Sequence, residues 1–552
     1  MICIRTLCIA LLLFTNLLIS AYGDALRTVA ISGQSAIDIG GGVVFNGFSD
    51  HVINDKGQSA FRGFLAGRGV IGLTSSGVWS EGRGTLALVI RRGDFAPGTD
   101  PGFKFSDFLQ ISLNNEGLTS ISGTITDIDV ISSNNDNGIW LHNAATNQLH
   151  LVIRSGSVAP DTDSGVVYSR VGAPALSDNG AVAFGGTLEG NGIDNSNNRG
   201  IWSGDIDGGL HLVARKGDRT PSIHLANEFD DFSGVAINAS GQTAFIGEIV
   251  DNFSTRRGIW ATRNNQLLSV AERGIPAPGL GDETTFRTVA ATSFPNVAIN
   301  SLGNTAFLGI LSGATINSNS SDGNASGIWS ESQDSGLELL VRANDAVPGM
   351  ELGVEFAGFG DPVLNDEGKL AFTAFLRGTN VDPRQSSASI WKGGGGDDLT
   401  LVVRSGTAAP GTQGDAKFID FHGTTINKRG QVAFVGQIRG DSPDSIGQLG
   451  IWAENESGDL QLIALTGAIL DVSDGTVSDF RTVSSLSFIG STGNGDGRPS
   501  AFNDLGQLAF TARFTDGTEG AFVSTLVAIP EPSTMLIAFA AFGPLLCRSY
   551  WR

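Results

Sequence analysis

Charged residues are scarce in this chain, and cysteine, histidine and tyrosine are nearly absent. Lys, Arg, Asp and Glu together make up only 16% of the 552 residues, whereas glycine occurs 76 times. This composition provides few charged helix faces and many tight turns, so it argues against a helical protein and favours short strands. The formal charge of −21 repels nucleic acid, which argues against a DNA- or RNA-binding role.

The few cysteines restrict the chemistry of the protein. Cys3, Cys8 and Cys547 all lie near the chain ends, so the long body between them offers no disulfide, thiolate metal site or cysteine nucleophile. The six histidines lack the spacing of zinc ligands, which argues against a zinc site. Because 41% of the residues are apolar, the body can be stabilised by burial alone.

Residues 1–23 have the pattern of a secretory signal peptide. Arg5 supplies the positive charge, an apolar run extends from Leu7 to Ile19, and small residues at positions 21 and 23 suit cleavage before Asp24. An uncleaved membrane anchor is the alternative. Either interpretation predicts an exported protein.

The C-terminal end has three parts. Pro530, Glu531 and Pro532 precede a largely apolar stretch, Met535–Cys547, which is followed by a basic end with Arg548 and Arg552. This layout resembles a PEP-CTERM sorting signal, although two arginines form a sparse basic end. The resemblance implies recognition by a bacterial exosortase and insertion in the membrane before processing. It also implies a place in the cell envelope, at the surface or in the extracellular matrix.

The body repeats one motif, Asn-x-x-Gly-x-x-Ala-Phe, in eight registers. Its glycines are 57, 117, 180, 241, 303, 368, 430 and 506, which lie 60, 63, 61, 62, 65, 62 and 76 residues apart. A Gly-Ile-Trp motif or a close variant follows each copy, and Leu-Val-x-Arg-x-Gly follows in several. The pattern resembles the bacterial tandem-repeat family with this motif, whose members carry assorted C-terminal anchors. The resemblance implies a surface or exported protein without an established activity.

Each repeat predicts four antiparallel strands. Asn-x-x-Gly suits a hairpin turn, and the residues after it alternate between apolar and polar, as in a half-buried strand. Further strands are predicted at Gly-Ile-Trp and at Leu-Val-x-Arg, and another precedes the Asn turn. Since only neighbouring repeats can cover the apolar faces, we predict an all-β, eight-bladed β-propeller over residues 24–527, with a sorting and anchor segment at 528–552. The Trp and Phe side chains are expected to pack between blades rather than to serve as exposed sugar platforms.

The chain ends support a closed ring. The last repeat lacks its fourth strand, whereas residues 29–36 align with a fourth-strand segment, Val402–Ala409. We therefore expect residues 27–33 to complete blade eight and remove an open edge. An open solenoid is the alternative.

Strand order divides the connections between two faces. The turns between the first and second strands and between the third and fourth strands lie on one face of the ring, which we call the Asn-turn face. The second-to-third and fourth-to-first connections share the other, the loop face, and are variable, which is typical of binding surfaces. A long insertion, Asp471–Arg498, is expected across the last blade junction. The candidate binding residues on the loop face are Asp127, Asp129, Asp161, Asp163, Asp230, Asp231, Asp441 and Asp444.

Several acidic turns contain oxygen ligands of the kind that Ca²⁺ prefers, among them Asn494-Gly-Asp496-Gly497. None completes a calcium-binding loop, so we expect solvated turns and no cofactor, with Ca²⁺ as a weak alternative. A recurring arginine of the fourth strand is expected to pair with acids or carbonyls. Its copies are Arg91, Arg154, Arg215, Arg342 and Arg404.

The function that these features favour is a non-enzymatic exported scaffold that binds glycan, protein or cation through its loop face. Exopolysaccharide or another surface protein is the expected partner. A hydrolase or lyase acting on extracellular polysaccharide is the alternative. A sialidase-type enzyme needs a tyrosine nucleophile, and only Tyr168 lies in the body of the chain.

Overall fold

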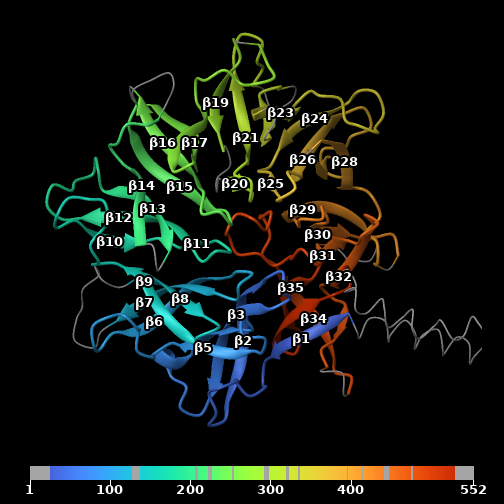
Figure 1. Ribbon diagram of the computed structural model, residues 1–552. Coiled ribbons are helices and arrows are strands. Elements are labelled where there is room, and N and C mark those ends of the chain that lie inside the picture. Colours follow the sequence, from blue (N-terminus) through green and yellow to red (C-terminus); the bar gives the residue numbers. More distant parts are fainter. Residues whose placement is uncertain are drawn as a thin grey trace, which may run out of the picture.

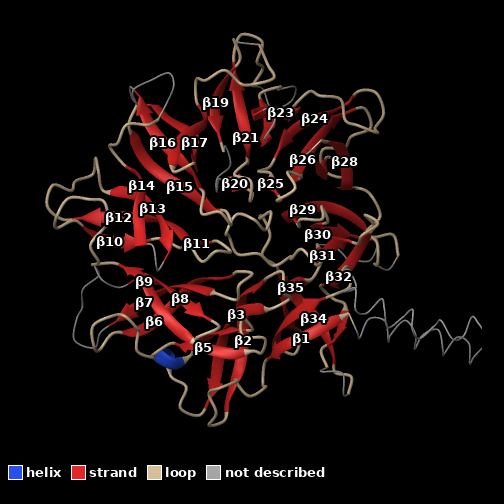
Figure 2. Cartoon of the chain, viewed as in Figure 1, coloured by secondary structure: helices blue, strands red, loops and turns tan. Residues whose placement is uncertain are grey.

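The computed structural model describes residues 25–528, apart from residues 127–136, 206–208, 222–226, 252–253, 282, 291–296, 319–322, 333–335, 395, 413, 441–446 and 474–476. The predicted signal peptide and the PEP-CTERM segment with Pro530, Glu531, Pro532, Arg548 and Arg552 lie outside these residues. Eight antiparallel sheets surround a central axis (Figure 1). Helix among the described residues is limited to one 3₁₀ turn, η1 (Gly72–Thr74) (Figure 2). No helix in the described ranges is long and apolar enough to span a membrane. The predicted all-β, eight-bladed propeller is confirmed.

The blades follow one another along the chain, and blades one to seven pair their main strands in sequence order. Blade one contains β2 (Val43–Ile53), β3 (Ser59–Gly67), β4 (Ser76–Ser80) and β5 (Ala87–Arg91). Blade two contains β6 (Lys104–Leu113), β7 (Thr119–Thr126), β8 (Asn137–Asn143) and β9 (Gln148–Arg154). Blade three contains β10 (Val167–Val171), β11 (Ala175–Leu176), β12 (Val182–Glu189), β13 (Arg199–Asp205) and β14 (Gly209–Arg215). Blade four contains β15 (Phe229–Ile237), β16 (Thr243–Asp251), β17 (Ser254–Arg263) and β18 (Gln266–Glu272).

The second half of the ring repeats this order. Blade five contains β19 (Thr285–Val289), β20 (Ala298–Ile299), β21 (Thr305–Ser312), β22 (Ser326–Ser332) and β23 (Gly336–Arg342). Blade six contains β24 (Val354–Phe359), β25 (Val363–Leu364), β26 (Leu370–Gly378), β27 (Ala388–Gly394) and β28 (Asp397–Arg404). Blade seven contains β29 (Lys417–Ile426), β30 (Val432–Arg439), β31 (Gln448–Glu454) and β32 (Leu460–Leu465). Blade eight contains β33 (Ile469–Asp471), β34 (Phe480–Ser487), β35 (Leu508–Phe514), β36 (Glu519–Ser524) and β1 (Leu26–Ile31).

The N-terminal strand completes blade eight, as predicted. β1 pairs antiparallel with β36, so that Leu26 lies opposite Ser524 and Ile31 opposite Gly520. Beside this ladder the Thr525 N–H donates to the Ala25 carbonyl at 2.7 Å. The two ends of the fold are thus joined within one sheet, which removes the open edge. The alternative of an open solenoid is wrong.

The hydrophobic core lies between the blades. Successive side chains of a strand point to opposite faces of the sheet, so Ile and Trp of Gly-Ile-Trp face different neighbours. Trp140 packs with Val78 of blade one, whereas the adjacent Ile139 packs with Trp202 of blade three. The tryptophans of this series are all fully buried. The prediction that the aromatic residues pack between blades is confirmed.

The glycine of Gly-Ile-Trp is required by close packing. A Cβ on Gly138 would lie 2.9 Å from the Trp140 ring and 2.8 Å from the Ile153 carbonyl oxygen. Trp140 Nε1 donates to the Pro97 carbonyl, in the connection that enters blade two, at 3.0 Å. Blade six has Ser389 in place of the glycine, and there Trp391 Nε1 donates to the Ser389 hydroxyl at 3.0 Å. One substitution in the motif therefore changes the partner of the indole.

The motif asparagine closes its own turn and also joins it to the next blade. Asn365 Oδ1 accepts hydrogen bonds from the N–H groups of Glu367 and Lys369 at 3.0 and 2.8 Å, and its Nδ2 donates to the Asn427 carbonyl at 2.8 Å. We call the chain of Nδ2–carbonyl bonds the asparagine ring. Its other steps run from Asn54 to Asn114, Asn114 to Ser177, Asn238 to Asn300, Asn300 to Asn365, Asn427 to Asn503 and Asn503 back to Asn54.

Ser177 interrupts the asparagine ring. Its side chain is shorter, and its hydroxyl donates to the Ala181 carbonyl at 3.0 Å within its own turn. The step to Asn238 therefore lacks the amide donor that the other turns supply. The asparagine ring is therefore interrupted between blades three and four.

Replacing Asn365 with alanine should lower the free energy of unfolding by about 2–4 kcal/mol, because the fully buried amide makes four hydrogen bonds. The matched control is Ser177→Ala, which removes a hydroxyl that acts only inside its turn and should cost about 1 kcal/mol. Urea unfolding followed by tryptophan fluorescence measures both. Equal losses would contradict the proposed link between blades.

Candidate functional site

The chain places one of its own segments in the central channel. Residues 488–500, which we call the plug, connect β34 to the last Asn turn and lie in the middle of the ring (Figure 1). The plug carbonyls of Ser500, Gly497, Asp496 and Thr492 accept the N–H groups of Ile53, Leu176, Ile237 and Ile426 at 2.7–3.4 Å. Each donor directly precedes the turn of its blade. The plug therefore cross-links blades one, three, four and seven at the Asn-turn end of the channel.

Glycines allow the plug to fit. A Cβ on Gly490 would overlap the Gly423 carbonyl, and one on Gly493 would overlap the Leu364 carbonyl. The sequence pattern predicted an insertion on the loop face over Asp471–Arg498, and for residues 488–498 this is wrong. These residues belong to the connection between the first and second strands of blade eight, where the backbone of the inner strands offers hydrogen-bonding groups to fill the channel.

Carboxylates surround the Asn-turn end of the channel. Asp55, Asp178, Asp366 and Asp504 each follow the first residue of an Asn turn. Asn115 Nδ2 donates to Asp55 and Asp178 at 2.7 and 2.9 Å, and Asn494 Nδ2 of the plug donates to Asp55 and Asp504 at 3.1 and 3.3 Å. Burial, together with the nearby charge of Asp55, raises the pKa of Asp504 to about 6. Burial also raises the pKa of Asp178.

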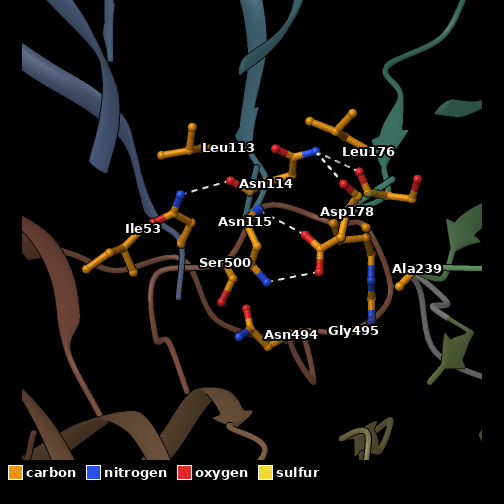
Figure 3. Close-up of a pocket in the computed structure, with 14 residues that line it drawn as sticks. Ile53, Leu113, Asn114, Asn115, Leu176, Asp178, Ala239, Asn494, Gly495 and Ser500 are labelled. Carbon is orange, nitrogen blue, oxygen red and sulfur yellow. Dashed lines mark hydrogen bonds between the residues drawn. The ribbon is translucent and has the colours of Figure 1, made fainter. Parts of the chain in front are cut away.

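A small cavity remains between these carboxylates and the plug (Figure 3). It has a volume of about 30 Å³ and is bordered by Asn114, Asn115, Asp178 and Asn494, beside the Ser177 interruption. This space suits a water molecule and excludes a sugar ring or a peptide. This cavity is therefore part of a structural polar cluster and is too small for such a ligand.

A larger groove opens toward the loop face between blades three and four. It has a volume of about 280 Å³. Its polar side chains are Arg170, Thr187, Arg199 and Asp231, and Phe232 adds an aromatic ring; its remaining lining consists of Gly172, Gly185, Gly186 and Gly200. Arg199 Nη1 donates to both oxygens of Asp231, at 2.7 and 2.8 Å, across the blade boundary.

The groove exists because blade three lacks a side chain at one strand position. Gly185 lies opposite Ile201, in the place held by Arg62, Ser122, Ile246, Leu308, Thr373, Val435 and Thr511 in the other blades. A Cβ on Gly185 would meet only Ile201 Cδ1, at 3.8 Å, and the Gly200 carbonyl, at 4.0 Å. The missing side chain leaves open space and does not relieve a clash. This contrasts with Gly138, whose neighbours leave no room.

Arg170 also departs from the repeat. The same position of the first strand is occupied by Asp107, Asp231 and Asp420 in blades two, four and seven. Asp107 forms an ion pair with Arg62 of the preceding blade, as Asp231 does with Arg199. The exposed Arg170 reverses the sign of this position, and within the described part of the chain no hydrogen bond or ion pair engages its guanidinium.

The structure places the predicted binding residues in different environments. Asp231 borders the groove, and Asp230 pairs with Lys216 Nζ at 2.9 Å. Asp161 Oδ2 accepts the Leu212 N–H at 3.0 Å, and Asp163 is exposed nearby. Asp127, Asp129, Asp441 and Asp444 lie outside the described residues. Of the four predicted residues that the structure describes, only Asp231 lines the groove, and the sequence interpretation missed Arg170, Arg199 and Phe232. Comparing the repeats position by position, rather than searching for acidic turns, would have found Arg170 and Gly185.

The repeated arginine has the structural role that the sequence predicted. Arg91, Arg215, Arg342 and Arg404 donate from Nε to carbonyls of Thr74, Asn197, Asn324 and Ser386, and Arg154 pairs with Asp100 at 3.2 Å. Four of these contacts hold the base of a second-to-third loop. The arginine series therefore supports the loops that form the loop face.

Tyr168 is enclosed in the core between blades. It is fully buried, lies edge-on to Trp202 with ring centroids 4.8 Å apart, and burial raises its pKa. Such a phenol is not accessible as a nucleophile. In the described ranges, no group of three or more His, Cys, Asp or Glu side chains is placed to hold a metal ion.

Comparison with known proteins identifies sequence relatives only at the level of a family. A family described as "Family of unknown function (DUF7453)" matches residues 13–157, 143–262 and 250–536. No curated protein matches this sequence.

Several solved structures resemble the fold. A structure titled "Structure of Dos1 propeller" has 9% identity and a TM-score of 0.35, covering 90% of this chain and 95% of its own. The polysaccharide lyase Uly1 has 9% identity and a TM-score of 0.35, with coverages of 81% and 95%. A protein from Lactobacillus plantarum has 13% identity and a TM-score of 0.31, with coverages of 74% and 95%. At these identities the likeness concerns the fold alone.

Replacing Asp504 with asparagine should stabilise the protein at pH 7 by about 1–3 kcal/mol and have a smaller effect at pH 5. The folded-state pKa of Asp504 is about 6, above its ordinary value of 3.8, so folding binds a proton between these values and the charged carboxylate opposes folding at higher pH. Asparagine keeps the oxygen that accepts the Lys428 N–H, and Asn115 already occupies the same turn position in blade two.

Urea unfolding at pH 5 and pH 7 measures this difference. Asp163→Asn removes the same charge from an exposed site and is the control for the loss of one negative charge. If Asp504→Asn shifted stability equally at both pH values, the raised pKa would be refuted.

Proposed function

The chain belongs to the DUF7453 family, whose function is unknown, and we propose that it is an exported scaffold of the cell envelope or extracellular matrix that binds polysaccharide or another surface protein through its loop face. The observation that carries this proposal is the groove between blades three and four, which opens toward the loop face. The loops around it rest on a rigid ring, which is the usual arrangement of a binding surface.

The positions of the two ends of the described fold support the proposed location at the cell envelope. Ala25 and Thr525 are hydrogen-bonded to each other, and the Val527 carbonyl accepts Gln431 Nε2 beside the Asn turn of blade seven at 3.2 Å. Both ends of the described fold therefore lie at the Asn-turn face. We propose that a signal peptide directs export, that an exosortase recognises the PEP-CTERM segment, and that the loop face is directed away from the membrane.

A polysaccharide-cleaving hydrolase or lyase is the alternative function. The convergent carboxylates at the channel are candidates for acid–base chemistry, but each of the central ones accepts amide hydrogen bonds, and the plug covers them. The described lining of the exposed groove contains a single carboxylate, Asp231, which is already paired with Arg199. These observations favour binding without turnover.

The proposal predicts that the full chain retains one or more polysaccharides on a glycan array and releases no new reducing or unsaturated ends from them. Prolonged incubation with the retained glycan, followed by a reducing-sugar assay, separates the two functions. Sugar release that depends on the protein would establish the enzymatic alternative, and an array on which no glycan is retained would refute glycan binding.

The proposed orientation predicts unequal access to the two faces on intact cells. An epitope inserted at Gly517, in the second-to-third turn of blade eight, should be labelled by antibody, whereas one at Ser457, in the third-to-fourth turn of blade seven, should be shielded. Both positions are exposed turns of the isolated fold, so the purified variants provide the control. Equal labelling on cells would contradict an orientation imposed by the C-terminal segment.

A further inference from the structure

We propose that the groove between blades three and four binds the carboxylate-bearing sugar of an acidic polysaccharide, a uronate residue, with Arg170 as its cation. This inference rests on the proposed function and specifies its ligand. The groove has a cation, Arg170, without a partner in the described part of the chain, an aromatic ring, Phe232, at its side, and unfilled space next to Gly185. Each of these three features matches a part of such a sugar.

The charge of the groove is local. The chain has a formal net charge of −21, so its surface as a whole repels an anionic polymer. Within the groove, however, Arg199 and Asp231 neutralise each other, and the exposed Arg170 remains without a partner in the described part of the chain. A guanidinium presents its N–H groups in a planar fork that matches both oxygens of a carboxylate. Arg170 is therefore the group that selects an acidic ligand.

The shape of the groove suits a flat ring with a polar edge. Gly185 leaves the space that a side chain fills in the other blades, and Phe232 of blade four, half-buried, offers its ring as a wall. Sugar rings place apolar C–H groups on one face and hydroxyls at the edge, so Phe232 can contact the face while Thr187 supplies a hydroxyl to the edge. The volume of about 280 Å³ is small for a ligand pocket, which favours one sugar unit of a chain.

A compact phosphate fits the groove less well. Phosphate sites in proteins are commonly built from several converging backbone N–H groups. Here the Gly172 N–H donates to the Gly185 carbonyl at 2.8 Å, and Gly185, Gly186 and Gly200 belong to strand pairs. The groove therefore offers an oxyanion mainly the guanidinium of Arg170, together with an aromatic surface that phosphate does not use.

The test compares acidic and neutral forms of one sugar chain. Tetrasaccharides of galacturonate, glucuronate and mannuronate are titrated calorimetrically into the full chain, with the methyl ester of each as the uncharged counterpart. At least one uronate should bind more tightly than its ester. Arg170→Gln should weaken that binding about tenfold or more while changing the affinity for the ester little, because a charge-assisted hydrogen bond is lost.

Two further variants distinguish binding in the groove from a general effect of net charge on the affinity for an anionic sugar. Gly185→Val fills the groove with the residue that blade seven carries at this position, Val435, and should abolish binding of both forms while the thermal unfolding temperature is maintained or raised. Arg68→Gln removes the same charge from an exposed position in the second-to-third loop of blade one and should leave binding unchanged.

The outcomes distinguish this inference from the proposed function. Equal affinity for uronate and ester, uronate binding unaffected by Arg170→Gln, or displacement of the uronate by equimolar inorganic phosphate would overturn the uronate site. If no uronate binds but the array retains another glycan, the inference falls and the scaffold function stands. An array that retains nothing refutes glycan binding as a whole, and with it the uronate site.

Discussion

The structure depends on the fact that a single blade of this chain has two apolar faces and cannot cover either of them alone. Blades one to seven present a tryptophan, and blade eight presents Phe522, to the preceding blade, while the adjacent aliphatic residue faces the following blade, as Trp140 and Ile139 illustrate. Burial of both faces of every blade requires a closed circle. The pairing of β1 with β36 closes that circle. The asparagine ring adds a polar link at the same boundaries, where each amide both shapes a turn and contacts the next one.

The departures from this repeat shape the groove on which the proposed function rests. Most positions of a blade pack between two neighbouring blades, so a substitution there requires a local rearrangement. Ser389 is an example, because it replaces the motif glycine and its hydroxyl accepts the hydrogen bond of the Trp391 indole. Gly185 and Arg170 are different, because neither is required by packing: one leaves space open, and the other leaves a charge without a partner in the described region. Both occur on the same side of blade three, and together they produce the groove.

The plug illustrates a second use of an irregular segment. Its sequence, rich in glycine and short polar residues, resembles a solvated calcium-type turn when considered alone. In the fold, its carbonyls satisfy the N–H groups that four inner strands leave at the channel, and its Asn494 separates two carboxylates that would otherwise repel each other. The channel, which is the usual place to expect a ligand in a ring of blades, is therefore filled at this end by the protein itself.

The sequence by itself determined the repeat, the four strands of each blade, the N-terminal strand that closes the ring and the structural roles of the tryptophan and arginine series. These features are encoded locally, because turn chemistry at Asn-x-x-Gly and the alternation of side chains act over a few residues and recur eight times. Only the tertiary structure decided that residues 488–500 enter the channel and that Asp231, among the predicted binding residues, shares a groove with Arg170 and Phe232. Those contacts join residues from different blades, and their geometry follows from closure of the ring, which no local pattern describes.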